Sequence, residues 1–236
     1  MNITIVFDDN VIDNRLSPGH GFSCLIKLNQ KTILFDTGSN SSTLLNNMRQ
    51  LGEDHKDIDS IFLSHIDYDH VGGLTGVIEQ NKAVTVYLLK SFPFYFKDEV
   101  KSLGATVEEV EEPKEIFSGV YTTGELGSDI REQSLIIDTS EGLVIITGCA
   151  HPGLVKIIQK SQYIIPEEKV YLVMGGFHLS GPPNRNIKSI IDSCLKLGIT
   201  KVAPCHCSGD ETRSMFKNKY GEEYIKSGVG RIITLS

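Results

Sequence analysis

Residues 61–74 have the sequence IFLSHIDYDHVGGL, and this stretch decides the fold. Its first three residues, Ile61 to Leu63, are apolar and predict the end of a buried strand, while Gly72 and Gly73 predict the start of a helix. The polar residues between them are therefore expected on a turn at the edge of a sheet, where functional sites commonly form.

Four side chains of this turn can bind a metal ion: His65, Asp67, Asp69 and His70. Two imidazoles and two carboxylates suit Zn, Fe or Mn better than Mg or Ca, which favour shells of oxygen alone. Because alternate residues of an extended turn point the same way, His65 and Asp67 can meet at one ion while Asp69 and His70 turn towards another. The spacing therefore indicates two ions. The alternative is a polar turn whose Asp side chains hydrogen-bond to the turn's own backbone.

The stretch resembles the signature of the metallo-β-lactamase superfamily, His-x-His-x-Asp-His followed by Gly-Gly-Leu. It departs from the signature at Asp67, where most members carry His. The carboxylate keeps the number of ligands but is the harder donor, which moves the metal preference towards Fe or Mn. The resemblance implies an α/β fold, the four-layer αββα sandwich, and two divalent metal ions, with Zn expected first and Fe or Mn as alternatives.

Composition excludes several classes of protein. Of 236 residues, 40% are hydrophobic and 22% are charged, which is ordinary for a globular protein. The net charge of −7 argues against a large nucleic-acid footprint, because phosphate binding needs a basic face. No apolar run is long enough to span a membrane, the start MNITIVF does not resemble a signal peptide, and five cysteines fit a reducing compartment. We therefore expect a cytoplasmic protein without membrane contact.

Strand and helix patterns alternate along the chain, in agreement with an α/β fold. Strands are expected at residues 2–7, 22–28, 32–35, 84–88, 106–110, 135–138, 143–147, 170–173 and 200–203, and helices at 41–51, 92–103 and 154–162, the first with a serine cap. Because candidate motifs extend from residue 8 to residue 209, we expect one domain, residues 1–236, with two βα-rich halves at about 1–118 and 119–236.

Three further histidines follow predicted strands: His151 in TGCAHPG, His178 in GGFHL and His206 in CHCSG. Any one of them alone would more often be structural than catalytic. Together these segments resemble one branch of the superfamily, the dihydropterin phosphate synthase-like proteins. That resemblance implies that His151 is the third ligand of the first ion and His206 the last ligand of the second. It also implies that Asp36, in Asp36-Thr37-Gly38, supports the metal-binding histidines without binding metal itself.

Residues 174–177 offer no carboxylate where many superfamily members have an Asp that bridges both ions. His178 lies nearby and can bind either a metal ion or substrate, and we favour substrate. His20, on a glycine-flanked loop, is a second candidate for substrate binding. We assign catalytic roles to Asp69 and His178.

Three cysteines stand beside these histidines, at positions 149, 205 and 207. The C-x-C pair around His206 lacks the usual C-x₂-C zinc spacing, and residues on either side of His206 are expected to point away from its ring. We therefore expect these cysteines to be small buried hydrophobic residues.

The expected chemistry is metal-assisted hydrolysis of a small-molecule substrate. The first ion would be held by His65, Asp67 and His151, and the second by Asp69, His70 and His206. Two carboxylates against two divalent ions leave a positive site, which favours anionic substrates such as phosphoesters. Three alternatives remain: a pterin-related phosphate synthase, a redox di-iron protein, and a metal or ligand sensor without activity. The oligomeric state is not indicated.

Overall fold

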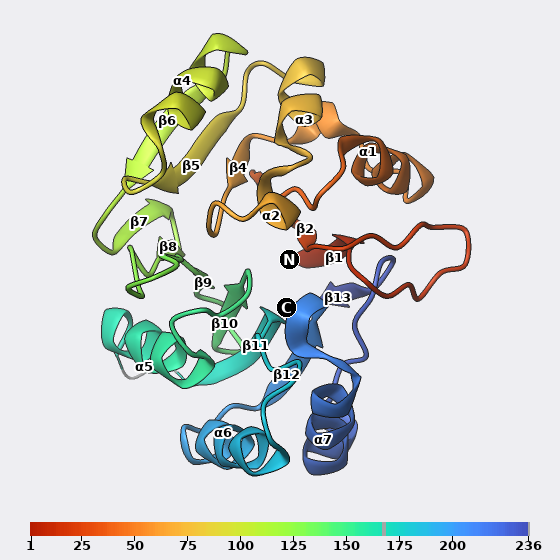
Figure 1. Ribbon diagram of the computed structural model, residues 1–236, viewed down its shortest axis with the longest axis vertical. Helices are drawn as coiled ribbons and strands as arrows, with labels where there is room; N and C mark the ends of the chain where they lie inside the picture. The colour runs from red at the N-terminus through yellow and green to blue at the C-terminus, as the bar shows by residue number, and fades with distance from the viewer. Residues whose placement is uncertain (167–168, 236) are drawn as a thin grey trace. The chain divides into compact units, whose positions relative to one another are not determined.

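The computed structural model describes residues 1–166 and 169–235 (Figure 1). The chain divides into two compact units: unit 1 comprises Met1–Glu111 and Ser227–Leu235, and unit 2 comprises Glu112–Lys226. The first boundary lies close to the one expected at about residue 118, but the last segment of the chain returns to unit 1. The single-domain organisation remains a prediction, and each unit is described by itself.

Unit 1 contains a seven-stranded sheet in the order β13-β1-β2-β3-β4-β5-β6. The strands are β1 (Asn2–Phe7), β2 (Ser23–Lys27), β3 (Thr32–Phe35), β4 (Ser60–Phe62), β5 (Thr85–Leu89), β6 (Thr106–Val110) and β13 (Ile232–Thr234). From β3 to β6 neighbouring strands run parallel, so their carboxyl ends meet at one edge. That edge carries the motif of residues 61–74 just after β4.

The helices of unit 1 are α1 (Ser41–Gln50), α2 (Tyr68–Val71), α3 (Leu74–Gln80) and α4 (Phe94–Ser102), with a 3-10 turn η1 at His55–Asp57. Leu44 of α1 and Val77 of α3 pack with strand residues such as Leu34 in one buried apolar cluster. The prediction that a serine caps α1 is wrong, because the capping residue precedes Ser41. Asn40 is the cap, because its side-chain oxygen accepts a hydrogen bond from the Thr43 amide at 2.9 Å.

Unit 2 contains a six-stranded sheet in the order β12-β11-β10-β9-β8-β7. The strands are β7 (Lys114–Phe117), β8 (Val120–Thr122), β9 (Leu135–Ile137), β10 (Leu143–Thr147), β11 (Val170–Gly176) and β12 (Lys201–Cys205). Strands β10, β11 and β12 are parallel, and their central residues are buried. Buried apolar runs are typical of parallel strands.

The helices of unit 2 are α5 (Leu154–Ile164), α6 (Asn184–Lys196) and α7 (Asp210–Tyr220), with 3-10 turns η2 (His206–Ser208) and η3 (Gly221–Glu223). Ile157 of α5, Ile191 of α6 and Phe216 of α7 belong to one apolar cluster with strand residues such as Ile145. In Figure 1 these helices lie farther from the centre of the view than β10, β11 and β12. Helices α6 and α7 and strands β7 and β8 were not expected from the sequence.

Within residues 1–166 and 169–235, no helix combines the length and the apolar character that a membrane span requires.

Candidate metal centre

The motif of unit 1 begins as expected and then departs from an extended turn. His65 follows β4, but Asp69 and His70 lie on the short helix α2, with Asp67 at its N-cap. The helix forms because the His70 amide donates a hydrogen bond to the Asp67 carbonyl at 2.9 Å. The rings of His65 and His70 are buried, with their centroids 4.1 Å apart.

Asp36 organises both buried histidines. Its Oδ2 accepts hydrogen bonds from His70 Nδ1 and from Ser64 Oγ, each at 2.7 Å, and its Oδ1 accepts one from the Ser64 amide at 2.7 Å. Since the Ser64 hydroxyl donates to Asp36, its oxygen accepts from His65 Nδ1, which lies 2.8 Å away. Both histidines therefore carry a proton on Nδ1, and this tautomer leaves each Nε2 as the atom that can bind a metal.

The four donor atoms of this motif form two pairs. Nε2 of His65 lies 3.5 Å from Oδ2 of Asp67, and Nε2 of His70 lies 3.7 Å from Oδ2 of Asp69. An imidazole nitrogen beside a carboxylate oxygen suits Zn, Fe or Mn, so these residues fit the metal ions that the sequence predicts. The binding of two ions remains a prediction.

His20 lies beside the same motif, although it is far from it in the sequence. Its Nδ1 is 2.9 Å from Oδ1 of Asp9, and its Nε2 is 3.5 Å from Oδ2 of Asp69. The His20 ring is largely exposed, so it can contact a molecule from solvent while Asp9 orients it. Its role in substrate binding remains a prediction.

The three histidines of unit 2 follow three neighbouring strands: His151 follows β10, His178 follows β11 and His206 follows β12. The rings of His151 and His178 have centroids 4.5 Å apart, and both line a pocket of about 480 Å³ together with Lys156 and Asp129. His206 is buried at the start of η2. The predicted ligands of unit 2 thus stand at one sheet edge, and their binding of metal remains a prediction.

Unusual backbone conformations concentrate at these residues. Among the described residues, four non-glycine residues have a positive φ, from 42° to 59°: Asp36, Ala150, His178 and His206. This conformation is disfavoured for residues with a Cβ, and it persists where surrounding contacts enforce it, which is frequently at functional sites. Each of the four belongs to the predicted site or adjoins one of its residues.

Glu132 is a residue of unit 2 that sequence reasoning missed. Its carboxylate is fully buried and accepts hydrogen bonds at 2.8 to 3.1 Å from four consecutive backbone amides, those of residues 148–151. These amides belong to the loop that carries His151. Glu132 therefore fixes that loop as Asp36 fixes the histidines of unit 1. The available signal was a Glu three residues before the apolar strand β9, where a buried carboxylate has little structural purpose unless it is hydrogen-bonded.

The expectation for the cysteines holds only in part. Cys149 and Cys205 are buried, but Cys207 is half-buried, and its Sγ lies 3.3 Å from Sγ of Cys149. The hydrogen bond with Cys149, together with the one to His178, lowers the pKa of the Cys207 thiol. The hydrogen bond to Cys207 raises the pKa of His178, because it stabilises the protonated ring.

The family model for the metallo-beta-lactamase superfamily matches residues 16–157, which is more than half of the chain. The chain belongs to this superfamily. One relative is the 7,8-dihydropterin-6-methyl-4-(beta-D-ribofuranosyl)-aminobenzene-5'-phosphate synthase of Methanocaldococcus jannaschii, with 31% identity over 91% of this chain and 89% of that protein. This similarity confirms the branch that the sequence motifs indicated.

Solved structures agree with this assignment. Tm1679, described as a metal-dependent hydrolase of the beta-lactamase superfamily, has a TM-score of 0.85 and 28% identity, covering 100% of this chain and 99% of its own. The short form of human tRNase Z has a TM-score of 0.67 at 13% identity over 100% of both chains, which shows a shared fold alone. The α/β metallo-β-lactamase fold expected from the sequence is confirmed.

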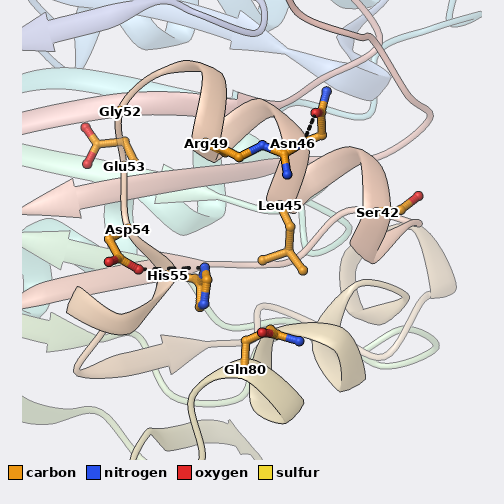
Figure 2. Close-up of a pocket in the computed structure, with 9 residues that line it drawn as sticks. All are labelled: Ser42, Leu45, Asn46, Arg49, Gly52, Glu53, Asp54, His55 and Gln80. Atoms are coloured by element: carbon orange, nitrogen blue, oxygen red, sulfur yellow. Dashed lines mark hydrogen bonds and ion pairs between the residues drawn. The ribbon is translucent and has the colours of Figure 1, made fainter.

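A larger pocket of unit 1 lies outside the predicted metal-binding motif. Figure 2 shows this pocket, of about 640 Å³, between α1, η1 and the end of α3. Arg49 donates a hydrogen bond to Asn46 at 2.6 Å, and Nδ1 of His55 lies 3.7 Å from Asp54. The His55 side chain is 28% exposed. Its charged side chains pair with neighbouring residues, Glu53 with Lys27 of β2 and His55 with Asp54, and we assign this pocket no role.

Proposed function

We propose that this metallo-β-lactamase superfamily member is a metal-dependent hydrolase that cleaves an ester bond in an anionic small molecule, with phosphoesters as the preferred class. The observation that carries the proposal is the hydrogen-bond network in which Asp36 holds His70 directly and His65 through Ser64. A buried carboxylate that fixes two imidazoles with Nε2 outward is the arrangement that supports metal ligands.

The proposed ligands are those expected from the sequence: His65, Asp67, Asp69, His70, His151 and His206. A pair of divalent ions bound by them, Zn first and Fe or Mn as alternatives, would lower the pKa of a water molecule and stabilise the negative charge that develops during hydrolysis. Hydrolysis of a phosphodiester adds this water to phosphorus and breaks one P–O ester bond, which releases an alcohol and a phosphomonoester. The chain itself would supply orientation and charge.

Several side chains suit an anionic substrate. Lys156 lies on the same pocket as His151 and His178, so a cation is available to pair with a phosphate or carboxylate group. His20 lies beside Asp69, where Asp9 orients its ring, and is the proposed substrate contact of unit 1. Asp69 is proposed to act both as a ligand and in catalysis.

Elemental analysis and activity assays on the same samples test this function. Protein purified without added metal is measured for Zn, Fe and Mn, then assayed on phosphodiester, phosphomonoester and lactone substrates before and after chelation. About two equivalents of Zn or Mn with chelator-sensitive hydrolysis would support the proposal. Iron with oxygen consumption would favour the redox di-iron alternative, and bound metal without turnover on any ester would favour the sensor.

A second candidate is a pterin-related phosphate synthase, because the relative from M. jannaschii carries that name and is similar over 91% of this chain. Such an enzyme would join a pterin to a phosphorylated aromatic amine instead of hydrolysing an ester. A condensation assay with pterin and phosphorylated ribofuranosyl aminobenzene substrates separates the two functions. Product formation without ester hydrolysis would favour the synthase.

A further inference from the structure

Unit 2 contains a cluster of metal-binding side chains whose two thiols have no part in the proposed hydrolase. Cys149, His178 and Cys207 each stand two residues beyond the end of a strand, namely β10, β11 and β12. These strands are parallel neighbours, so their carboxyl ends meet at one edge of the sheet. Ligands commonly bind at such edges of parallel sheets.

The three donor atoms are close enough to share one ion. The two sulfurs and a ring nitrogen of His178 all lie within 4.8 Å of one another, and the sulfurs are 3.3 Å apart. Two sulfurs at about 2.3 Å from a tetrahedral zinc ion lie roughly 3.8 Å apart, so binding would separate these sulfurs by roughly half an ångström. A disulfide would instead require the sulfurs to approach by more than about 1 Å.

The backbone at the end of β11 and just after it lies close to the sulfur of Cys207. The His178 amide donates a hydrogen bond to this sulfur at 3.3 Å, as backbone amides do to the sulfur ligands of metal sites. A Cβ on Gly176 would lie 2.7 Å from the same sulfur and 2.3 Å from the Gly148 carbonyl oxygen. A residue with a side chain at position 176 therefore could not leave room for the thiol.

Strained backbone conformations also lie at or beside the three donor residues. His178 has φ of 50°, Ala150 next to Cys149 has φ of 59°, and His206 next to Cys207 has φ of 42°. Thus each donor either has a positive φ or adjoins a residue that has one. Such strain is retained where the positions of side chains are tightly determined.

We propose that Cys149, His178 and Cys207 bind one soft divalent metal ion, with zinc as the preferred ion. Two thiolates and one imidazole are a donor set that zinc prefers and that Mg and Ca do not. The exposed His178 ring lines the 480 Å³ pocket, which leaves access for a water molecule or a substrate group as the fourth ligand. On binding, the thiol protons pass to solvent. This assignment gives His178 a metal-binding role in place of the substrate contact expected from the sequence.

The test uses Co²⁺ as a spectroscopic probe of thiolate binding. Protein stripped of metal and kept reduced with a phosphine is titrated with Co²⁺, and the sulfur-to-cobalt charge-transfer absorption is recorded. We expect a saturable band in the wild type that is weaker in Cys149→Ser and in Cys207→Ser and absent from the double variant. Cys194→Ser, which removes a buried thiol on α6, is the matched control and should retain the band.

X-ray absorption of the zinc-loaded wild type gives the same answer without relying on any variant. Sulfur scattering at about 2.3 Å supports the proposal. Scattering from nitrogen and oxygen alone overturns it, as does a band that persists in the double variant Cys149→Ser/Cys207→Ser. A loss of two hydrogens by mass spectrometry in protein that binds no thiophilic metal would show a disulfide instead. Ions held only by carboxylates and imidazoles give no sulfur signal, so failure here leaves the hydrolase proposal intact.

Discussion

Glu132 accepts a hydrogen bond from the backbone amide of His151, with 2.8 Å between Oε2 and the amide nitrogen. The other carboxylate oxygen accepts hydrogen bonds from three more backbone amides of the same loop. A buried carboxylate that carries a charge is stable only when such donors surround it, and the donors in turn fix the loop. Glu132 is thus the residue of unit 2 on which the position of His151 depends.

Glu132→Gln should destabilise the protein, because the amide group of Gln turns a donor towards backbone N–H groups that need an acceptor. We expect a loss of about 3 kcal/mol in the free energy of unfolding, because hydrogen bonds to a charged group stabilise a fold more than those to a neutral group. Urea denaturation measures it. Glu112→Gln, at an exposed position, is the control and should change stability by less than about 0.5 kcal/mol. Equal stability of the two variants would contradict the role given to Glu132.

Asp36→Asn should weaken metal binding while the fold survives. The variant keeps the size of the side chain but removes the charge that holds His70 and, through Ser64, His65. Loss of such a support typically lowers metal affinity by about 10- to 100-fold. Competition with a coloured zinc chelator gives the affinity, and Asp57→Asn, on the exposed turn η1, is the control. An unchanged affinity would show that these histidines do not bind the ion.

Asp67→His should change which metal is bound. His65 Nε2 is 3.5 Å from the Asp67 carboxylate, so a second imidazole here would replace a hard oxygen donor with a softer nitrogen. In cells supplied with equal Zn, Fe and Mn, we expect a higher Zn fraction in the variant than in the wild type by elemental analysis. An identical metal composition would mean that Asp67 does not bind the ion.

Sequence reasoning located the strand ends and the motif, because apolar runs, glycines and the spacing of His and Asp are local signals. It misplaced Asp69 and His70, since the short helix α2 depends on a hydrogen bond that the extended-turn rule ignores. It also misjudged Cys207. The 3-10 turn η2 begins directly after β12, so the alternation of side chains expected for a strand ends at Cys205. Glu132 was missed because its partners lie 16 to 19 residues away.

His20→Ala should alter turnover without loss of metal. His20 lies 3.5 Å from Asp69 but is exposed and outside the predicted ligand set. Its removal should therefore take away the proposed substrate contact and leave the donors of His65, Asp67 and His70 in place. We expect a higher KM or a lower kcat on the preferred ester with unchanged metal content. Asp9→Asn, which removes the partner that orients His20, should have a smaller effect in the same direction. Metal loss in His20→Ala would refute the assignment.

Gly176→Ala should be far more damaging than an ordinary Gly→Ala change. The new methyl group would lie 2.3 Å from the Gly148 carbonyl oxygen, and backbone cannot yield as a flexible side chain can. We expect a loss of about 3 kcal/mol in the free energy of unfolding, at the upper end for overpacking. Gly198→Ala is the matched control, because its Cβ meets no atom within 4 Å and only its φ of 76° is unfavourable, which should cost about 1 kcal/mol. Urea denaturation separates the two, and a Gly176→Ala variant no less stable than Gly198→Ala would mean that β11 does not closely approach the loop after β10.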